Sequence, residues 1–398
     1  DLALCVFRHA PSESRQQAES AQKVIPHVRF MFYKFAMKIG DATLKQGQRL
    51  RGRGVASNAT GRFEPAMHVA FDDGWDLPET DRLVQTEVRA ERARSALAYN
   101  RSPDLPFDRS INPYRGCEHG CVYCFARPSH AFLNLSPGLD FETRLIARPG
   151  IGAVLDRELR AKSYQVATVA IGTNTDPYQP IEATERVMRE VVEVLSAFNH
   201  PLAITTKGTL IERDIDLLAP MAAKGLLRVG ISVTSLDARL SRAMEPRCPA
   251  PARRLVTIQR LAAAGIPVRA MIAPVVPGLT DSELEPILQA VQQAGAQAAS
   301  YIALRLPREV SGLFQDWLAA HYPDRAAKVM ARIRDMHGGQ DYDPAFGRRM
   351  TGEGLWADLL RQRFHKAVAR LGLATRLPGL RCDMFQPPAR AGDQMSLF

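Results

Sequence analysis

Between residues 108 and 306, short apolar runs alternate with longer stretches in which apolar side chains recur every three or four positions. The short runs are nearly continuous and rich in β-branched residues, which is typical of parallel strands buried on both faces. The longer stretches have the period of amphipathic helices. The pattern therefore predicts strands at 166–172, 202–206, 227–233, 268–273 and 298–304, with helices between them at 183–198, 212–224, 252–264 and 281–294.

Strands that alternate with helices indicate an α/β fold, here with a parallel sheet curled into a partial (β/α) barrel. The segments on either side of the barrel lack this alternation. The expected order is a disordered leader (1–45), an N-terminal arm with one charged helix at 81–98 (46–105), the partial barrel (106–310), a helical C-terminal region (311–380) and a flexible tail (381–398).

Composition restricts the class of protein. The 398 residues are 46% hydrophobic and 24% charged, which is ordinary for a globular protein. No stretch approaches the roughly 18 uninterrupted apolar residues of a membrane span. Six cysteines are too few for a disulfide scaffold, and three of them lie within eight positions, a spacing typical of a ligand cluster in a reducing compartment. The sequence thus excludes a membrane-spanning protein and favours a cytoplasmic one.

The net charge of +10 is concentrated at the ends of the chain. Lys and Arg outnumber Asp and Glu by 10 to 4 over residues 1–60 and by 12 to 6 over 321–382, whereas residues 61–320 hold 29 against 30. This distribution suits a catalytic core flanked by segments that contact a polyanion such as nucleic acid. Simple solubility is the alternative explanation.

A cysteine motif lies directly after the place where the first strand of the barrel is expected, near residue 108, at which the alternating pattern begins. The segment INPYRGCEHGCVYCF (111–125) places Cys117, Cys121 and Cys124 in a CxxxCxxC spacing, and Gly116 and Gly120 let the loop fold inward. Three thiolates on one such loop can converge on one metal centre.

Two alternatives compete with an iron–sulfur cluster at this loop. One is a structural zinc site in which His119 or His130 completes a Cys₃His set, and the other is chance clustering of buried cysteines. A zinc site usually pairs two ligands from one turn with two from another element. No second pair follows here, so the pattern favours a cluster with one iron left open.

The CxxxCxxC loop, with Tyr123 just before its last cysteine, resembles the signature of the radical S-adenosylmethionine (SAM) superfamily. Further motifs over about residues 46–310 are similar to those of its spore-photoproduct-lyase-like branch, and most closely to uncharacterised members of that branch. They are GTNTDPYQPIE (172–182), TTKGTLIERDIDLL (205–218), SVTSLD (232–237), MEPR (244–247) and IAPVVPGLTD (272–281).

The resemblance implies that Cys117, Cys121 and Cys124 hold a 4Fe-4S cluster whose fourth iron binds SAM. One electron from the cluster, which a low-potential donor must supply, would cleave SAM to methionine and a 5′-deoxyadenosyl radical that abstracts a hydrogen atom. A barrel would position this chemistry at the C-terminal ends of its strands, where every motif falls.

Matched positions in the family imply further cofactor contacts. Tyr123 would pack near the adenine, although a buried tyrosine beside a metal loop is also unremarkable. The side chains of Thr173, Asn174 and Thr175 suit the ammonium group of SAM, or they merely form a turn. The ends of the next two strands would bring Lys207 and Ser232 to the carboxylate and ribose of the cofactor.

Four charged residues, Asp176, Glu182, Glu245 and Arg247, fit either a substrate rim or ion pairs that brace loops. The lyase itself carries a cysteine hydrogen donor after its second strand, where this chain reads TNTD. That departure puts the lyase's own reaction in doubt. Cys248 lies beyond the fourth strand, on the catalytic face, and could act as the donor, although a buried apolar thiol is the more common role.

The last residues, AGDQMSLF, are not explained by radical chemistry. Gln394, Leu397 and Phe398 closely resemble the bacterial sliding-clamp-binding pentapeptide, and the alternative is a tail that docks on its own protein. With the charge distribution, this motif favours a nucleic-acid substrate in DNA repair or modification. A protein or small-metabolite substrate, or a metal-binding interaction module without turnover, are the other hypotheses.

Overall fold

A computed structural model of the chain describes residues 52–64 and 84–390. All of them belong to one compact unit, residues 43–398. The leader expected at 1–45 and the clamp-like motif at 394–398 lie outside the described residues. Within the described ranges, no helix is long and apolar enough to cross a membrane.

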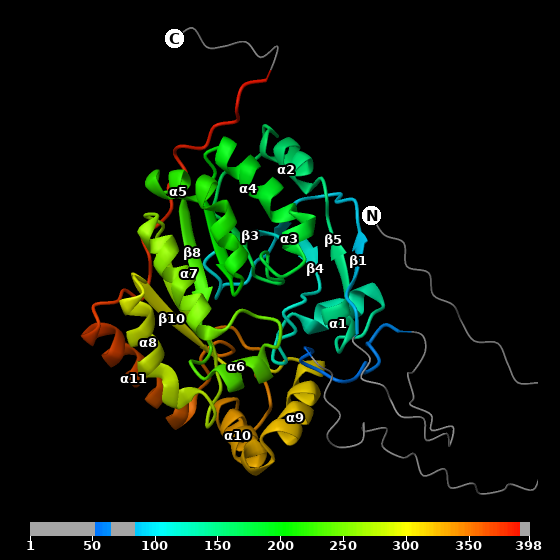
Figure 1. The fold of residues 1–398 in the computed structure, drawn as a ribbon, viewed down its shortest axis with the longest axis vertical. Coiled ribbons are helices and arrows are strands. Elements are labelled where there is room, and N and C mark those ends of the chain that lie inside the picture. The colour runs from blue at the N-terminus through cyan, green and yellow to red at the C-terminus, as the bar shows by residue number, and fades with distance from the viewer. Residues whose placement is uncertain (1–51, 65–83, 391–398) are drawn as a thin grey trace, which may run out of the picture. The chain divides into compact units, whose positions relative to one another are not determined.

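A seven-stranded sheet forms the centre of this unit (Figure 1). Its strand order is β10-β9-β8-β7-β6-β3-β2, and the six strands from β3 to β10 run parallel while β2 joins the edge in the antiparallel sense. The predicted partial barrel is confirmed, with all five predicted strands in place. The strands are β2 (Leu97–Tyr99), β3 (Arg109–Ile111), β6 (Val169–Ile171), β7 (Leu202–Thr206), β8 (Leu227–Ser232), β9 (Val268–Val275) and β10 (Ala298–Ala303).

Helices follow the strands in alternation and cover the outer face of the sheet (Figure 1). Five of them, α2, α4, α5, α7 and α8, bury apolar side chains against strand residues that are themselves inaccessible to water, and this continuous core drives the packing. The helices are α2 (Ile151–Leu159), α3 (Glu182–Glu185), α4 (Val187–Ala197), η2 (Thr209–Asp214), α5 (Ile215–Ala223), α6 (Ala238–Met244), α7 (Pro251–Ala263), η3 (Asp281–Glu283) and α8 (Leu284–Gln293).

The charged helix predicted at 81–98 is wrong for its described part. Residues 84–98 contain β1 (Glu87–Ala90) and the start of β2. β1 pairs in parallel with β5 (Arg144–Ala147), which pairs antiparallel with β4 (Tyr114–Arg115), so a second sheet of three strands forms. Pairing with β5 gives the backbone of β1 the hydrogen bonds that a helix would have made internally, and this tertiary contact overrides local helix propensity.

The helical C-terminal region contains α9 (Glu309–His321), α10 (Pro323–Met336) and α11 (Gly354–Arg370). The stretch between α10 and α11 is not helical, and it bridges the two edges of the open sheet. Met350 accepts a hydrogen bond from Ala303 of β10 at 2.9 Å. Arg349 forms a bidentate pair, at 2.6 and 2.7 Å, with Asp104 in the β2–β3 loop.

The flexible tail expected at 381–398 is wrong for residues 381–390. These residues dock on the N-terminal ends of the barrel strands, where Arg381 donates to Gly225 and Gln386 to Phe198 at 3.0 Å each. The ring of Phe385 packs against Phe198 and Tyr164. In Figure 1 the red segment accordingly runs over the end of the sheet away from α6, α9 and α10. Burial of the Phe385 ring stabilises the docked segment and offsets the conformational entropy that the chain loses when it is ordered. The Pro- and Gly-containing composition of the tail gave no sign of this contact.

Candidate active site

The three cysteines lie on the loop between β4 and η1 (Arg127–Leu133). Cys117 and Cys121 are buried, Cys124 is half-buried, and all three are free thiols. Backbone hydrogen bonds fix both sides of the loop: Cys117 donates to Phe141 at 2.9 Å and Val122 to Met244 at 3.0 Å. The three cysteines of the motif are therefore held in place by backbone contacts with α1 (Asp140–Thr143) and α6.

A fully buried arginine supports the inside of this loop. Arg127 donates to the carbonyl oxygens of Cys121 at 2.9 Å and Gly120 at 3.2 Å, and it forms a 2.5 Å ion pair with buried Glu142. Its guanidinium thus satisfies carbonyl groups that would otherwise be buried without partners. Sequence reasoning missed this residue because nothing in the local sequence indicates that the arginine at the start of η1 is buried.

The N-terminal arm reaches the same loop. Gly54 donates to the Glu142 carboxylate at 2.9 Å, and a Cβ added at Gly54 would lie 1.8 Å from the carbonyl oxygen of Gly120. Gly120 itself has a φ of 67°, which favours glycine. Arg53 donates to the Glu142 carbonyl at 3.0 Å. Glycine at both positions therefore allows the arm to seat the cysteine loop at close range.

Asp176 links three segments at the C-terminal ends of β6 and β7. Its carboxylate accepts hydrogen bonds from Thr206 Oγ1 at 2.5 Å and from the Lys207 backbone at 2.7 Å, and it lies 3.4 Å from His119 Nδ1 on the cysteine loop. Burial alone would raise the pKa of Asp176, but His119 and the donated hydrogen bonds lower it to about 2. Asp176 braces the loops, as the second of the two sequence interpretations held.

The predicted SAM-contacting residues fall at the same end of the sheet. Thr173 and Asn174 are half-buried after β6, whereas the Thr175 hydroxyl is buried and donates to the Tyr114 carbonyl at 3.0 Å. Ser232 is buried at the end of β8. Lys207 follows β7, and its Nζ lies 5.8 Å from the centre of the Tyr123 ring. Thr175 therefore braces the turn, and the other positions remain predictions.

Glu245 is the centre of a buried network beside the cysteine loop. Its carboxylate accepts from the Tyr123 hydroxyl, from Thr234 Oγ1 at 2.5 Å and from the guanidinium of Arg254. Burial opposes the charged form, but the charges of Arg254 and Lys207 prevail and lower the pKa of Glu245 to about 2. Glu245 is thus a structural ion-pair residue and not part of an exposed rim. Arg254 gave no signal in the sequence.

The two remaining rim candidates also form ion pairs. Glu182 is fully buried, accepts from the Tyr114 hydroxyl and pairs with Arg213 at 2.5 Å. Arg247 is more than one-third exposed and pairs with Glu118, the residue after the first cysteine, at 2.8 Å. Of the four charged candidates, only Arg247 faces solvent enough to meet a substrate.

Cys248 lies against the cysteine loop, with its Sγ 3.8 Å from Cys121 Sγ. This contact and the charge of Lys207 outweigh burial and lower the pKa of the Cys121 thiol to about 7, which favours a thiolate ligand. Burial, with the charges of Cys121 and Cys117, raises the pKa of Cys124 to about 12. Binding to cationic iron would remove this mutual repulsion.

The donor set fits an iron–sulfur cluster. Within residues 52–64 and 84–390, no three His, Cys, Asp or Glu side chains converge on a point that could hold one metal ion. A 4Fe-4S cluster makes no such demand, because each thiolate binds a different iron.

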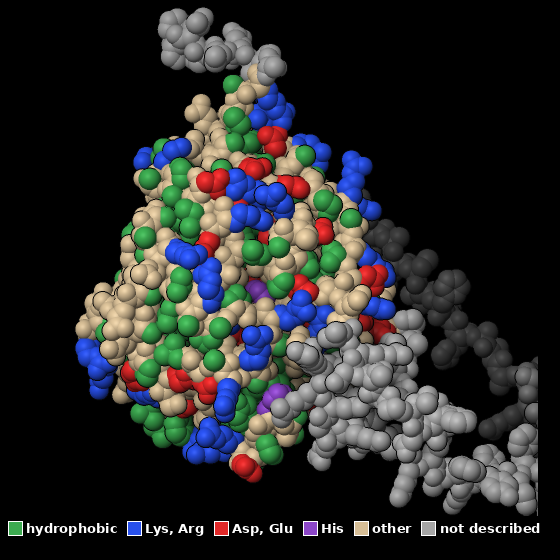
Figure 2. All heavy atoms as spheres, in the orientation of Figure 1, with side chains coloured by type: hydrophobic (Ala, Val, Ile, Leu, Met, Phe, Trp, Pro, Cys, Tyr) green, Lys and Arg blue, Asp and Glu red, His purple; other side chains and the backbone are tan. Residues whose placement is uncertain are grey.

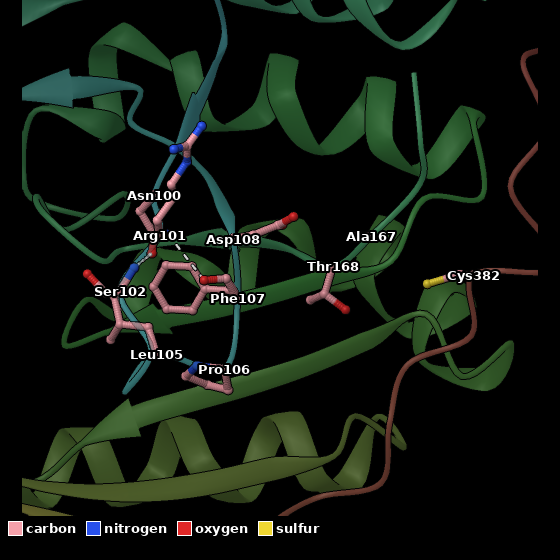
Figure 3. Close-up of a pocket in the computed structure, with 10 residues that line it drawn as sticks. All are labelled: Asn100, Arg101, Ser102, Leu105, Pro106, Phe107, Asp108, Ala167, Thr168 and Cys382. Atoms are coloured by element: carbon pink, nitrogen blue, oxygen red, sulfur yellow. Dashed lines mark hydrogen bonds between the residues drawn. The ribbon is translucent and has the colours of Figure 1, made fainter. Parts of the chain in front are cut away.

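A pocket opens at the other end of the barrel (Figure 3). It is lined by the β2–β3 loop, including Leu105 and Phe107, by Thr168 just before β6, and by Cys382 of the docked tail. In Figure 3 Cys382 lies on the far side of Thr168 from the loop residues. Since its walls precede the strands, this pocket is separate from the cysteine loop.

The cysteine loop at one end of a parallel half-barrel defines a class of protein. The family model of the Radical SAM superfamily matches residues 111–291, from the end of β3 into α8. The chain belongs to the radical SAM superfamily and is a radical SAM enzyme. Its family uses a 4Fe-4S cluster and SAM, which are the cofactors of this enzyme.

Particular relatives extend this result. An uncharacterised protein of Mycobacterium tuberculosis is 39% identical over 302 residues, which are 75% of this chain and 84% of the relative. An uncharacterised protein of Methanocaldococcus jannaschii is 25% identical over 215 residues, or 54% of this chain and 76% of the relative.

Among solved structures, spore photoproduct lyase complexed with dinucleoside spore photoproduct matches with a TM-score of 0.52 at 15% identity, covering 72% of this chain and 81% of that one. A mutant of the same lyase with bound AdoMet and the dinucleoside matches with a TM-score of 0.51 at 15% identity and the same coverage. At this identity the likeness shows a shared fold.

Proposed function

We propose that Cys117, Cys121 and Cys124 hold the cluster, and that the enzyme acts on nucleic acid in repair or modification. When bound, the cluster and SAM supply a 5′-deoxyadenosyl radical for hydrogen abstraction. The supporting observation is the meeting of the cysteine loop with the ends of β7 and β8, where Lys207 lies over Tyr123 beside Cys121. The enzyme also needs a low-potential electron donor.

The residues around this junction would bind and orient SAM. The Lys207 ammonium is suited to the SAM carboxylate, and its pKa is raised because the charges of Cys121 and Glu245 outweigh burial. Thr173, Asn174 and Ser232 would offer hydroxyl and amide groups to the ammonium and ribose. Tyr123, held by Glu245, would present its ring to the adenine. Residues 121–123 of the loop share a second apolar core with α6, α9 and α10. This second core excludes water behind the loop.

A nucleic-acid substrate is supported by the basic ends of the sequence and by the shared fold with a lyase whose structure holds a dinucleoside photoproduct. Charge alone does not single out a binding face. On the face in Figure 2, Lys and Arg side chains are interspersed with Asp and Glu instead of forming one continuous basic patch.

Anaerobic reconstitution tests the assignment. Wild-type protein should bind a 4Fe-4S cluster and release 5′-deoxyadenosine under dithionite, whereas Cys121→Ala should lose iron and SAM cleavage. Cys382→Ala, which removes a free thiol at the other end of the barrel, is the matched control and should behave as wild type. Full iron content and cleavage in Cys121→Ala would refute the cluster assignment. Substrate class is then read from damaged DNA and RNA added to the loaded enzyme.

We also propose Cys248 as the hydrogen donor that replaces the one missing after β6. Its S–H bond would break as a product C–H bond forms, and the resulting thiyl would be reduced by the low-potential donor with a proton from solvent. Cys248→Ser should keep the cluster and SAM cleavage but lose substrate turnover. Unchanged turnover would leave Cys248 as a packing residue in the second core.

The C-terminal motif would recruit the enzyme to a bacterial sliding clamp through Gln394, Leu397 and Phe398. The described chain is docked as far as Arg390, which pairs with Asp156, so three residues separate the docked segment from the motif. Deleting residues 394–398 should abolish clamp binding in a pull-down and leave cluster content intact. Equal binding by the full and truncated chains would contradict the assignment.

A further inference from the structure

Four exposed phenylalanines in the described residues each lie close to an arginine side chain. Phe63, Phe125, Phe132 and Phe346 have between 46% and 68% of their surface exposed, and each ring lies within 6 Å of an arginine guanidinium. Large apolar rings in water are unfavourable, so a group of them at one place indicates an interaction surface.

Three of these rings lie beside the cysteine loop. Phe125 directly follows Cys124, and Phe132 lies on η1, 5.2 Å from the Phe63 ring. We call the set Arg62, Phe63, Phe125, Phe132 and Arg305 the Phe–Arg strip.

The segment that joins β10 to α9 holds the strip together. Arg305, just after β10, lies 4.8 Å over the Phe125 ring. Arg62 lies over Phe63 and Phe132 at 5.3 and 5.8 Å, and its Nε pairs with Glu309, the first residue of α9, at 2.8 Å. Both ends of the strip are therefore fixed by residues 305–309, at the carboxyl end of the barrel that carries the cysteines.

The chemistry of the strip matches an unpaired nucleotide. Exposed aromatic rings stack on bases of any sequence, and guanidinium groups neutralise phosphate. In the described part of the chain the half-buried Arg305 keeps its Nε buried without a hydrogen-bond partner, while its Nη1 donates to Met350 Sδ at 3.2 Å. Bases of an intact duplex stack on one another and offer no free face, which disfavours double-stranded ligands.

We propose that the Phe–Arg strip binds single-stranded nucleic acid and leads an unpaired base to the cofactor site. This inference rests on the proposed nucleic-acid substrate and adds that the substrate is unpaired where it meets the enzyme. Phe125 and Phe132 are the stacking groups, and Arg62 and Arg305 hold the backbone.

Fluorescence anisotropy with a labelled single-stranded oligonucleotide tests the strip on the reconstituted full-length enzyme. Phe125→Ala and Phe132→Ala should each weaken binding about tenfold, as expected for loss of one stacked base. Tyr99→Ala is the matched control. Like the phenylalanines of the strip, Tyr99 is exposed (64%) and its ring lies 5.5 Å from an arginine guanidinium, that of Arg109. Unlike them, it lies on the edge strand β2, beside the end of β3 that is opposite the cysteine loop. A duplex of the same sequence should bind more weakly.

The outcomes separate the strip from the proposed function. If the enzyme turns over a nucleic acid and both phenylalanine variants bind it as wild type does, the strip is wrong while the function stands. Binding of the duplex or of a polyglutamate peptide more tightly than the single strand would also overturn the assignment of the strip. SAM cleavage under dithionite, measured in parallel, should be unchanged in Phe132→Ala, because Phe132 lies on η1 and not on the cysteine loop. If wild type binds no nucleic acid but still cleaves SAM, the strip and the substrate class are both wrong and the cluster assignment survives.

Discussion

Buried carboxylates hold the catalytic end of the barrel together. Asp176, Glu182 and Glu245 each accept hydrogen bonds from at least two different segments. A carboxylate in a low-dielectric interior is stable only when its oxygens are satisfied in this way. These residues therefore set the geometry of the loops that carry the side chains proposed to bind the cofactor, and they need not touch a ligand themselves.

Replacing Lys207 by alanine should weaken SAM binding by roughly 10- to 100-fold, because a charge-assisted contact contributes about 1.5–3 kcal/mol. Iron content should not change, since Lys207 is not a cluster ligand. Calorimetric titration of the reconstituted protein measures the affinity. Lys224→Ala is the control, because Lys224 is exposed at the far end and pairs with Asn199. Equal SAM affinity in both variants would assign Lys207 a structural role.

Replacing Glu245 by glutamine should destabilise the fold by about 3 kcal/mol or more, because buried Arg254 loses its counter-charge. The folded pKa of Glu245 is about 2, below its usual value of 4.5, so its stabilisation is complete above about pH 4.5 and is lost as the pH falls toward 2. Urea unfolding should show the gap between wild type and variant closing over that interval.

Glu87→Gln is the control for this experiment, since Glu87 is exposed on β1 and its ion pair with Arg89 contributes little. A gap that stays constant from pH 7 to pH 3 would show that the charge of Glu245 is not responsible.

The cysteine loop is an element without regular structure, and its shape comes from its neighbours. Carbonyl groups of the loop turn inward to Arg127, glycines allow the arm to approach, and α6 and α9 cover its outer side through a shared apolar core. A loop of this kind is ordered by tertiary contacts, so changes outside the motif can disable it.

Arg127→Met should lower iron content although all three cysteines remain, because the carbonyl groups of Cys121 and Gly120 lose their donor. The far-UV circular dichroism should stay close to wild type, since the barrel core is separate. Arg144→Met is the control, because Arg144 is half exposed on β5. Full iron incorporation in Arg127→Met would show that the loop is ordered without its arginine.

At the scale of the whole molecule, the two ends of the barrel carry different features. The cysteine loop, α6 and the Phe–Arg strip lie at the carboxyl ends of the strands, while the docked residues 381–390 cross the amino ends. The described segment that precedes the C-terminal motif therefore lies at the end of the barrel away from the cysteine loop.

Removing residues 380–398 should destabilise the protein by about 1.5–3 kcal/mol, the typical value for burying one phenylalanine such as Phe385. Removing only 391–398 should leave stability unchanged within about 0.5 kcal/mol. Urea midpoints of the two truncations measure the difference. Equal midpoints would mean that the docked segment contributes nothing to the fold.

The sequence by itself determined the barrel and the cysteine motif. Buried parallel strands must be nearly continuous in apolar residues, so β7 and its neighbours were visible locally, and three cysteines in eight positions restrict the chemistry wherever they lie. The tertiary structure alone decided that residues 87–90 form a strand, that 381–390 dock, and that Arg127 and Glu245 are buried. These features depend on partners far away in the chain, such as β5, Phe198, Glu142 and Arg254, and local patterning carries no information about which distant group will satisfy a polar or apolar side chain.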